Sequence, residues 1–284
     1  MKITFLGTGA DTSYPLPSCR CEFCIKARQV GGKSLRKRSL AVINDDLIVD
    51  FGPDMMSASF MHNVDISKIK YCLITHPHAD HFDAAHLSTR IPDYATKNTF
   101  PMEIYASKLS FDRMTKMLID IGYISDIRNT KEQAKLNIKI FEAKNAEEIK
   151  VGEYSIIPLS SNHDDSVESL VYVISHNGKS ILYCTDTDTL KEENWDAMLS
   201  KKCSLDLIVL DHTYGFEIEG GGHLNGNKFV EHLNKFKQLK LLKPSARIIA
   251  THISHEGNPP HDEMQKIATN YGYEVGYDGL SIEL

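Results

Sequence analysis

The sequence predicts a layered α/β protein in a single domain. Apolar stretches typical of strands occur in both halves of the chain, and amphipathic stretches typical of helices occur between some of them. The chain has 284 residues, 42% hydrophobic and 25% charged, which suits a soluble globular protein with a sizeable core. No repeat, low-complexity tract or Gly/Ser/Pro-rich linker divides it, so residues 1–284 are expected to form one domain.

Most of the expected elements are strands. They fall within residues 2–9, 40–52, 70–75, 154–163, 169–186, 205–213 and 246–252. The first of two expected hairpins bends at the polar residues 44–46, and the second at Asn177-Gly178, a dipeptide typical of tight turns. Amphipathic spacing predicts a helix over residues 226–242, and helices are expected to fill much of residues 105–135.

Charge and hydropathy limit the classes of partner. A formal net charge of −6 argues against nucleic acid as the main partner. No apolar run reaches about 18 residues, and the first residues do not resemble a signal peptide. No membrane segment is therefore expected, the expected location is the cytoplasm, and a homodimer remains possible. The one basic run, residues 33–39, is expected to be a solvated loop.

The six cysteines fall into two groups. Cys72, Cys184 and Cys203 are isolated in the sequence. Cys72 and Cys184 lie in apolar runs and are expected to be buried, reduced core residues, whereas Cys203 carries no motif. Three others, Cys19, Cys21 and Cys24, are spaced Cys-x-Cys-x2-Cys. In a reducing compartment, such a tight group is more typical of a metal site than of disulfides.

The stretch THPHADHF, residues 75–82, is rich in residue types that bind metal ions. It contains His76, His78, Asp80 and His81. Burying several such groups without a metal would cost several kcal/mol each. Alternate residues of an extended chain point to one side, so His76 and His78 can share one metal while Asp80 and His81 turn towards a second.

The ends of other expected strands carry the same kind of residue. His163, Asp186 and His252 each come at or just after the end of an apolar run. The sheet holds residues at strand ends in fixed positions, and a metal site needs several ligands that are held precisely. The sequence therefore predicts a metal centre built from strand ends.

This pattern resembles the signature of the metallo-β-lactamase-fold hydrolases, over nearly the whole chain. The resemblance implies a four-layer αββα sandwich with two divalent metal ions at one edge. In such enzymes His76, His78 and His163 would hold one ion, and Asp80, His81 and His252 the other. Asp186 would bridge both ions. Asp50 would orient a ligand histidine.

Three further features resemble the PhnP-like cyclic-phosphate phosphodiesterases: the cysteine triplet, the stretch GGGHLN and the stretch THISH. The resemblance implies a structural zinc held by Cys19, Cys21, Cys24 and His255, with His223 as the alternative fourth ligand. It further implies that His223 is catalytic and acts near the scissile phosphate. The catalytic candidates are therefore His223 and Asp80, and the substrate would be a small phosphodiester such as a ribosyl cyclic phosphate. His212 is expected near the site without a role.

Several alternatives remain open. His/carboxylate ligands suit zinc, manganese and iron alike, and the PhnP-like resemblance favours manganese, with zinc as the alternative, for the two active-site ions. The chain could instead be a tRNA 3′-endonuclease-like nuclease, a lactone or thioester hydrolase, or a PqqB-like cofactor-biosynthesis protein. The segment 82–162 matches the PhnP-like pattern least well and could shape a substrate pocket or lid.

Overall fold

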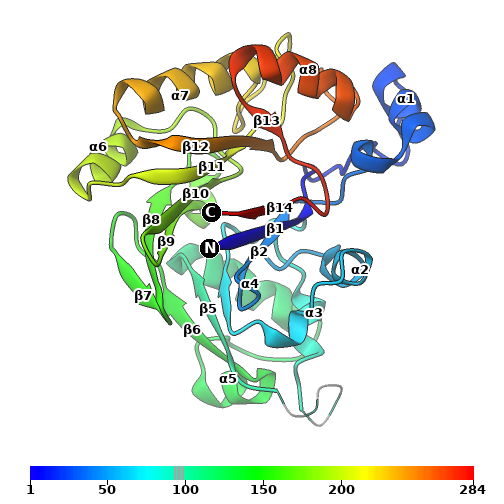
Figure 1. The fold of residues 1–284 in the computed structure, drawn as a ribbon. Helices are drawn as coiled ribbons and strands as arrows, with labels where there is room; N and C mark the ends of the chain where they lie inside the picture. The colour runs from blue at the N-terminus through cyan, green and yellow to red at the C-terminus, as the bar shows by residue number, and fades with distance from the viewer. Residues whose placement is uncertain (93, 95–96, 98) are drawn as a thin grey trace.

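Two seven-stranded mixed β-sheets lie at the centre of the computed structural model, which describes residues 1–92, 94, 97 and 99–284 (Figure 1). The strands of the first sheet are, in spatial order, β14 (Ser281–Glu283), β1 (Lys2–Gly7), β2 (Leu40–Ile43), β3 (Leu47–Val49), β4 (Tyr71–Leu73), β5 (Met102–Ala106) and β6 (Ile138–Glu142). The strands of the second are β13 (Glu274–Val275), β12 (Leu242–Thr251), β11 (Leu205–Asp211), β10 (Lys179–Cys184), β9 (Leu170–His176), β8 (Tyr154–Ser160) and β7 (Ile149–Val151).

The helices lie outside the two sheets. They are α1 (Glu22–Val30), α2 (Met55–Met61), α3 (Ala84–Ser88), α4 (Lys108–Asp120), α5 (Thr130–Leu136), α6 (Glu192–Ser200), α7 (Gly226–Gln238) and α8 (His261–Tyr271), with short 3-10 turns η1 (Gly32–Ser34), η2 (Ile66–Lys68) and η3 (Asp165–Val167). Figure 1 shows α6, α7 and α8 over the second sheet, and α2, α3 and α4 beside the first. None of the described helices is long and apolar enough to span a membrane.

Three apolar layers hold these elements together. One lies between the sheets and contains side chains such as Phe5, Leu73, Tyr183 and Leu207, all buried. A second layer, around Trp195, lies between the second sheet and its helices. A third layer, which includes Phe111 and Met114 of α4, lies between the first sheet and its helices. The layer between the sheets explains the continuous apolar runs of the inner strands, since both faces are covered. The αββα sandwich expected from the resemblance is confirmed.

A strand forms in every range where one was expected, but some boundaries were wrong. The helix expected over 226–242 ends at Gln238, because Lys240 adopts a left-handed conformation (φ 54°) and β12 begins at Leu242. Strands β5, β6, β7, β13 and β14 were not predicted. Cys72 and Cys184 are buried and reduced, as expected.

The expectation of a solvated loop at residues 33–39 was wrong for its central residue. Arg36 is only 3% exposed. Its guanidinium donates to Oγ1 of Thr8 and to the carbonyl oxygen of Gly276, and lies 3.2 Å from Nδ1 of His261. Partners from three distant segments therefore replace water around the charge.

Candidate metal centre

Six strands bring polar residues to one edge of the sandwich. Asp50 follows β3, the loop with His76, His78, Asp80 and His81 follows β4, His163 follows β8, Asp186 follows β10, Asp211 ends β11, and His252 follows β12. Strands β3 and β4 are parallel to each other, as are β10, β11 and β12, so their carboxyl ends lie at the same edge of each sheet.

Three histidines form the first group of side chains at this edge. Nδ1 of His78 lies 2.9 Å from Nε2 of His76 and 3.3 Å from Nε2 of His163. Burial lowers the pKa of both His76 and His163, so their rings are neutral and their lone pairs are free to bind a metal. Nε2 of His78 is held by Asp164 at 3.0 Å, which leaves Nδ1 facing the other two rings.

Two carboxylates and two histidines form the second group. Nε2 of His81 lies 2.9 Å from Oδ2 of Asp80 and 3.1 Å from Oδ2 of Asp186. Nε2 of His252 lies 3.6 Å from Oδ2 of Asp80 and 3.2 Å from Oδ1 of Asp186. All four side chains are buried.

Asp186 lies between the two groups. Its Oδ1 is 4.0 Å from Nε2 of His76 and 3.9 Å from Nε2 of His163, in addition to its contacts with His81 and His252. A single carboxylate can therefore reach both groups, which is the arrangement that two neighbouring metal ions require.

The donor set fits divalent cations. Asp50, Asp80 and Asp186 are buried together, and no lysine or arginine of the described chain forms an ion pair with them. Nε2 of His81, Oδ2 of Asp186 and Nε2 of His252 are buried without a hydrogen bond. Several buried carboxylates and unsatisfied ring nitrogens at one point are costly unless a cation joins them. Nitrogen and carboxylate ligands suit zinc and manganese.

The ring nitrogens that face away from the metal centre are also held by polar contacts. Nδ1 of His81 lies 2.7 Å from Oδ2 of Asp50, whose other oxygen accepts the backbone N–H and the hydroxyl of Thr75. Nδ1 of His252 lies 2.8 Å from Oγ1 of Thr213. Such partners set which ring nitrogen faces a metal.

The glycine run before His223 has a specific role. The carbonyl oxygen of Gly222 lies 2.9 Å from Nδ1 of His163. Gly222 has a φ of 74°, and an added Cβ would come within 3.2 Å of Nδ1 of His163. Glycine at this position therefore lets the loop approach the histidine closely.

Three of the site residues adopt a left-handed backbone conformation. Asp50, Asp186 and His252 have φ values of 68°, 54° and 57°. Each non-glycine residue in this region costs about 1–2 kcal/mol. Such cost is typical of positions where the surrounding structure forces a side chain into a functional site.

His223 lies at the rim of the site rather than beside the cysteines. Its Nδ1 is 2.9 Å from Oδ2 of Asp211 and 3.1 Å from Oγ1 of Thr213. Burial opposes the charged form of His223, but the negative Asp211 raises its pKa to about 9. Asp211 therefore favours the protonated form of the ring, which has a proton to give.

The sequence-based predictions did not include Asp211, although they placed its neighbour His212 near the site. Asp211 is fully buried and accepts the backbone N–H groups of Asp186 and Thr213. His212 points the other way, into the core, where its Nε2 lies 3.1 Å from the Tyr273 hydroxyl. Side chains alternate along a strand, so two neighbours at its end face opposite sides.

The cysteine triplet meets His255, not His223. Nδ1 of His255 lies 3.6 Å from Sγ of Cys21 and 3.9 Å from Sγ of Cys19, and the donor atoms of all four residues lie within 4.8 Å of one another. Tetrahedral zinc with ordinary bond lengths separates sulfur and nitrogen ligands by about 3.6 Å. The four residues, Cys19, Cys21, Cys24 and His255, therefore fit a closed zinc site, and none of the cysteines is in a disulfide.

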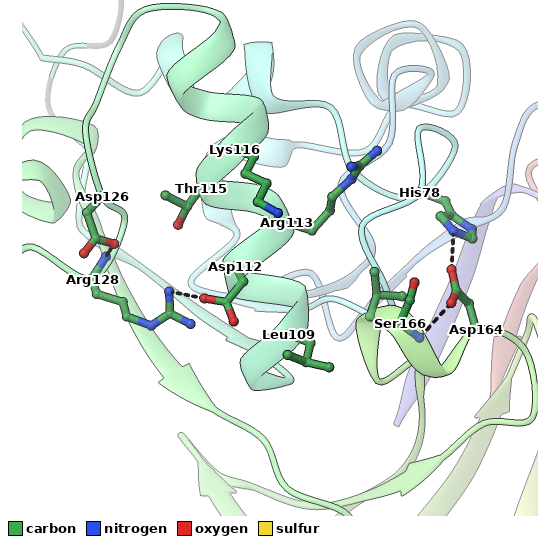
Figure 2. Close-up of a pocket in the computed structure, with 11 residues that line it drawn as sticks. His78, Leu109, Asp112, Arg113, Thr115, Lys116, Asp126, Arg128, Asp164 and Ser166 are labelled. Atoms are coloured by element: carbon green, nitrogen blue, oxygen red, sulfur yellow. Dashed lines mark hydrogen bonds and ion pairs between the residues drawn. The ribbon is translucent and has the colours of Figure 1, made fainter.

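A cavity of about 450 Å³ opens onto the metal centre. Its lining includes His78, Asp80, Asp186 and His223. A second cavity of about 840 Å³ adjoins it beyond His78 (Figure 2). The segment 82–162 contributes α4 to both cavities; residues 93, 95, 96 and 98 of that segment lie outside the described part of the chain.

Two facing sheets with a His/Asp cluster at their common edge define a protein of the metallo-β-lactamase fold. The family model described as the beta-lactamase superfamily domain matches residues 46–253. The chain therefore belongs to this superfamily, and we class it as a hydrolase. A search of curated proteins finds no sequence match.

Solved structures share the fold over the whole chain. A diphosphatase from the PhnP family superimposes with a TM-score of 0.74 and 21% identity, covering 100% of this chain and 96% of that one. Zn²⁺-bound PqqB from Methylobacterium extorquens has a TM-score of 0.72 and 18% identity, with complete coverage of both chains. The short form of human tRNase Z has a TM-score of 0.64 and 17% identity, covering 100% and 99%. At these identities the similarity concerns the fold alone.

Proposed function

We propose that this chain hydrolyses small phosphodiesters with two divalent metal ions, manganese or zinc. One ion would be held by His76, His78 and His163, and the other by Asp80, His81 and His252. The observation that carries the proposal is the position of Asp186 between these groups, next to His223, whose ring pairs with Asp211. When bound, such a pair of ions lowers the pKa of a shared water and neutralises charge on phosphoryl oxygens.

The chain's own residues would orient the metal ligands and supply the proton that the leaving oxygen needs. Asp50 and Thr213 keep two ligand rings in position through their outer nitrogens. In the reaction, a water oxygen forms a bond to phosphorus while the bond to the leaving oxygen breaks. His223 gives its proton to the leaving oxygen, and the water gives up one proton to solvent. The products are a phosphomonoester and an alcohol.

The size of the site and the net charge of the chain favour a small substrate. The cavity of about 450 Å³ lies in the range of small-molecule sites. The net charge of −6 does not favour a nucleic acid. Among small phosphodiesters, a ribosyl cyclic phosphate is the substrate that we favour.

The test is a substrate comparison on protein of known metal content. Zinc, manganese and iron are counted per chain, and bis(p-nitrophenyl) phosphate, a 2′,3′-cyclic nucleotide and a lactone are assayed side by side. We expect turnover of the phosphodiesters to monoesters. Turnover of the lactone alone would favour a carbon-ester hydrolase, and processing of a pre-tRNA at physiological salt would favour a nuclease. A single redox-active iron without hydrolysis would favour a PqqB-like role.

A further inference from the structure

The larger cavity beside the metal centre carries two positive charges that have no partner among the described residues. It is lined by α4, by residues 126 and 128, and by the turn around η3. Figure 2 shows Arg113 on α4 directed towards the side on which His78 lies, with Lys116 one turn further along the helix. Both side chains are exposed, and neither forms a hydrogen bond or an ion pair with any described residue.

The other charged side chains of this cavity already have hydrogen-bond or ion-pair partners. Nη1 of Arg128 lies 2.9 Å from Oδ1 of Asp112. Asp164 accepts the N–H of Ser166 at 2.8 Å and holds Nε2 of His78 at 3.0 Å. Asp126, beyond Arg128, accepts the backbone N–H of that arginine at 2.9 Å. Among the described residues, Arg113 and Lys116 are therefore the cationic side chains of this lining that remain free to bind an anion.

Arg113 connects this larger cavity to the reaction site. It lines both cavities, as does His78, which the proposed function makes a metal ligand. Residues three apart on a helix lie on one face with their Cβ atoms about 5–6 Å apart, so Arg113 and Lys116 can contact the same group. An arginine fork and a lysine ammonium are the usual partners of phosphate and carboxylate groups.

We propose that the cavity beside α4 is a substrate subsite in which Arg113 and Lys116 bind a second anionic group, a phosphate or a carboxylate, of the molecule that is hydrolysed. This inference rests on the proposed phosphodiester hydrolysis. The phosphodiester would lie at the metal centre, and the rest of the substrate would extend past His78 into the larger cavity. Its volume of about 840 Å³ is enough for a sugar or nucleoside that carries such a group.

The test compares substrates that differ in one anionic group. The p-nitrophenyl ester of thymidine 5′-phosphate is assayed beside the same ester with a 3′-phosphate, and beside its 3′-O-succinyl ester. The wild-type protein should hydrolyse at least one anionic form with a kcat/KM about ten- to hundred-fold higher than the parent ester. Whether the phosphate or the carboxylate gains more identifies the group. In the double variant Arg113→Gln/Lys116→Gln, this preference should fall to near one.

A matched control removes two charges elsewhere. Lys237 on α7 and Lys266 on α8 are exposed and form no ion pair with a described residue, so Lys237→Gln/Lys266→Gln changes the net charge equally and should keep the preference. No preference in the wild-type protein would overturn the subsite. An equal loss for all substrates in the double variant would also overturn it, because Arg113 would then act on the scissile group or on the fold.

A binding measurement separates this inference from the proposed reaction. Thymidine 3′,5′-bisphosphate and thymidine 5′-monophosphate are titrated into metal-loaded protein by calorimetry. If no ester is hydrolysed, the proposed function fails, but the subsite still requires tighter binding of the bisphosphate by the wild-type protein than by Arg113→Gln/Lys116→Gln. Equal binding of the two nucleotides would contradict the subsite whatever the activity.

Discussion

Nδ1 of His223 lies 2.9 Å from Oδ2 of Asp211, and the same carboxylate oxygen accepts the backbone N–H of Asp186 at 2.9 Å. The other oxygen of Asp211 accepts the N–H and the hydroxyl of Thr213. One buried carboxylate thus positions the proposed proton donor, the backbone of the proposed bridging ligand and the threonine behind His252.

Replacing Asp211 tests this coupling. We expect Asp211→Asn to lower kcat about 10- to 100-fold, because His223 would lose its negative partner and part of its orientation. His223→Ala should lower kcat by about 10²- to 10⁴-fold, the usual contribution of a general acid. The measurement is phosphodiester turnover together with metal content. Asp206→Asn, at the opposite end of β11, should leave kcat unchanged; unchanged kcat in Asp211→Asn would contradict the coupling.

Replacing Asp186 tests the bridge. Asp186→Ala should abolish turnover and lower the amount of metal bound at the active site, because the variant lacks the only carboxylate that reaches both groups among the described residues. Metal analysis after gel filtration measures the loss. Asp188 lies in the same loop, but its carboxylate pairs with Lys228. The control variant Asp188→Ala should therefore keep both metals. Full metal content and turnover in Asp186→Ala would remove this residue from the site.

Replacing a cysteine tests the structural zinc. Cys21→Ser should lose about one zinc per chain and melt at a lower temperature, because metal binding contributes directly to folding. The dinuclear ligands should still bind their ions. Cys203→Ser changes an isolated, partly buried thiol and serves as the control. An unchanged zinc count in Cys21→Ser would contradict the proposed zinc site.

His212 makes the stability depend on pH. Burial lowers its pKa from 6.5 to about 4, so the folded protein keeps the ring neutral while the unfolded chain takes up a proton below about pH 6.5. Its contribution is therefore present above pH 6.5 and is lost as the pH falls towards 4.

Denaturant unfolding at several pH values measures this effect. Between pH 7 and pH 4.5, the wild-type protein should lose about 2–3 kcal/mol more unfolding free energy than His212→Gln, which cannot take up the proton. Parallel pH curves for the two proteins would show that His212 does not titrate in this range.

The sequence was most informative where several ligand-type residues follow apolar strands. His76, His163, Asp186 and His252 could be placed together because strand ends of a layered α/β fold meet at one edge. The αββα arrangement itself came from the resemblance of that ligand order to a known family, since strand periodicity alone does not fix how sheets pack.

Other features depend on contacts that no local pattern reveals. Asp211 could have been found from the alternation at the end of β11, which places Asp211 and Thr213 on one side and His212 on the other. Arg36 lies in a basic run, and only the distant carbonyl of Gly276 and the hydroxyl of Thr8 explain its burial. Likewise, β5 and β6 are short strands whose pairing partners lie far away in the sequence.

The most direct test of the central claim is metal reconstitution of the active site. The protein is stripped of metal, its cysteine site is refilled with one zinc, and manganese or zinc is then added while bis(p-nitrophenyl) phosphate hydrolysis is followed. We predict that turnover rises until two further ions per chain are bound and that Asp186→Ala shows no such rise. Turnover that stays absent at every metal content, or that appears equally in Asp186→Ala, would contradict a two-metal phosphodiesterase.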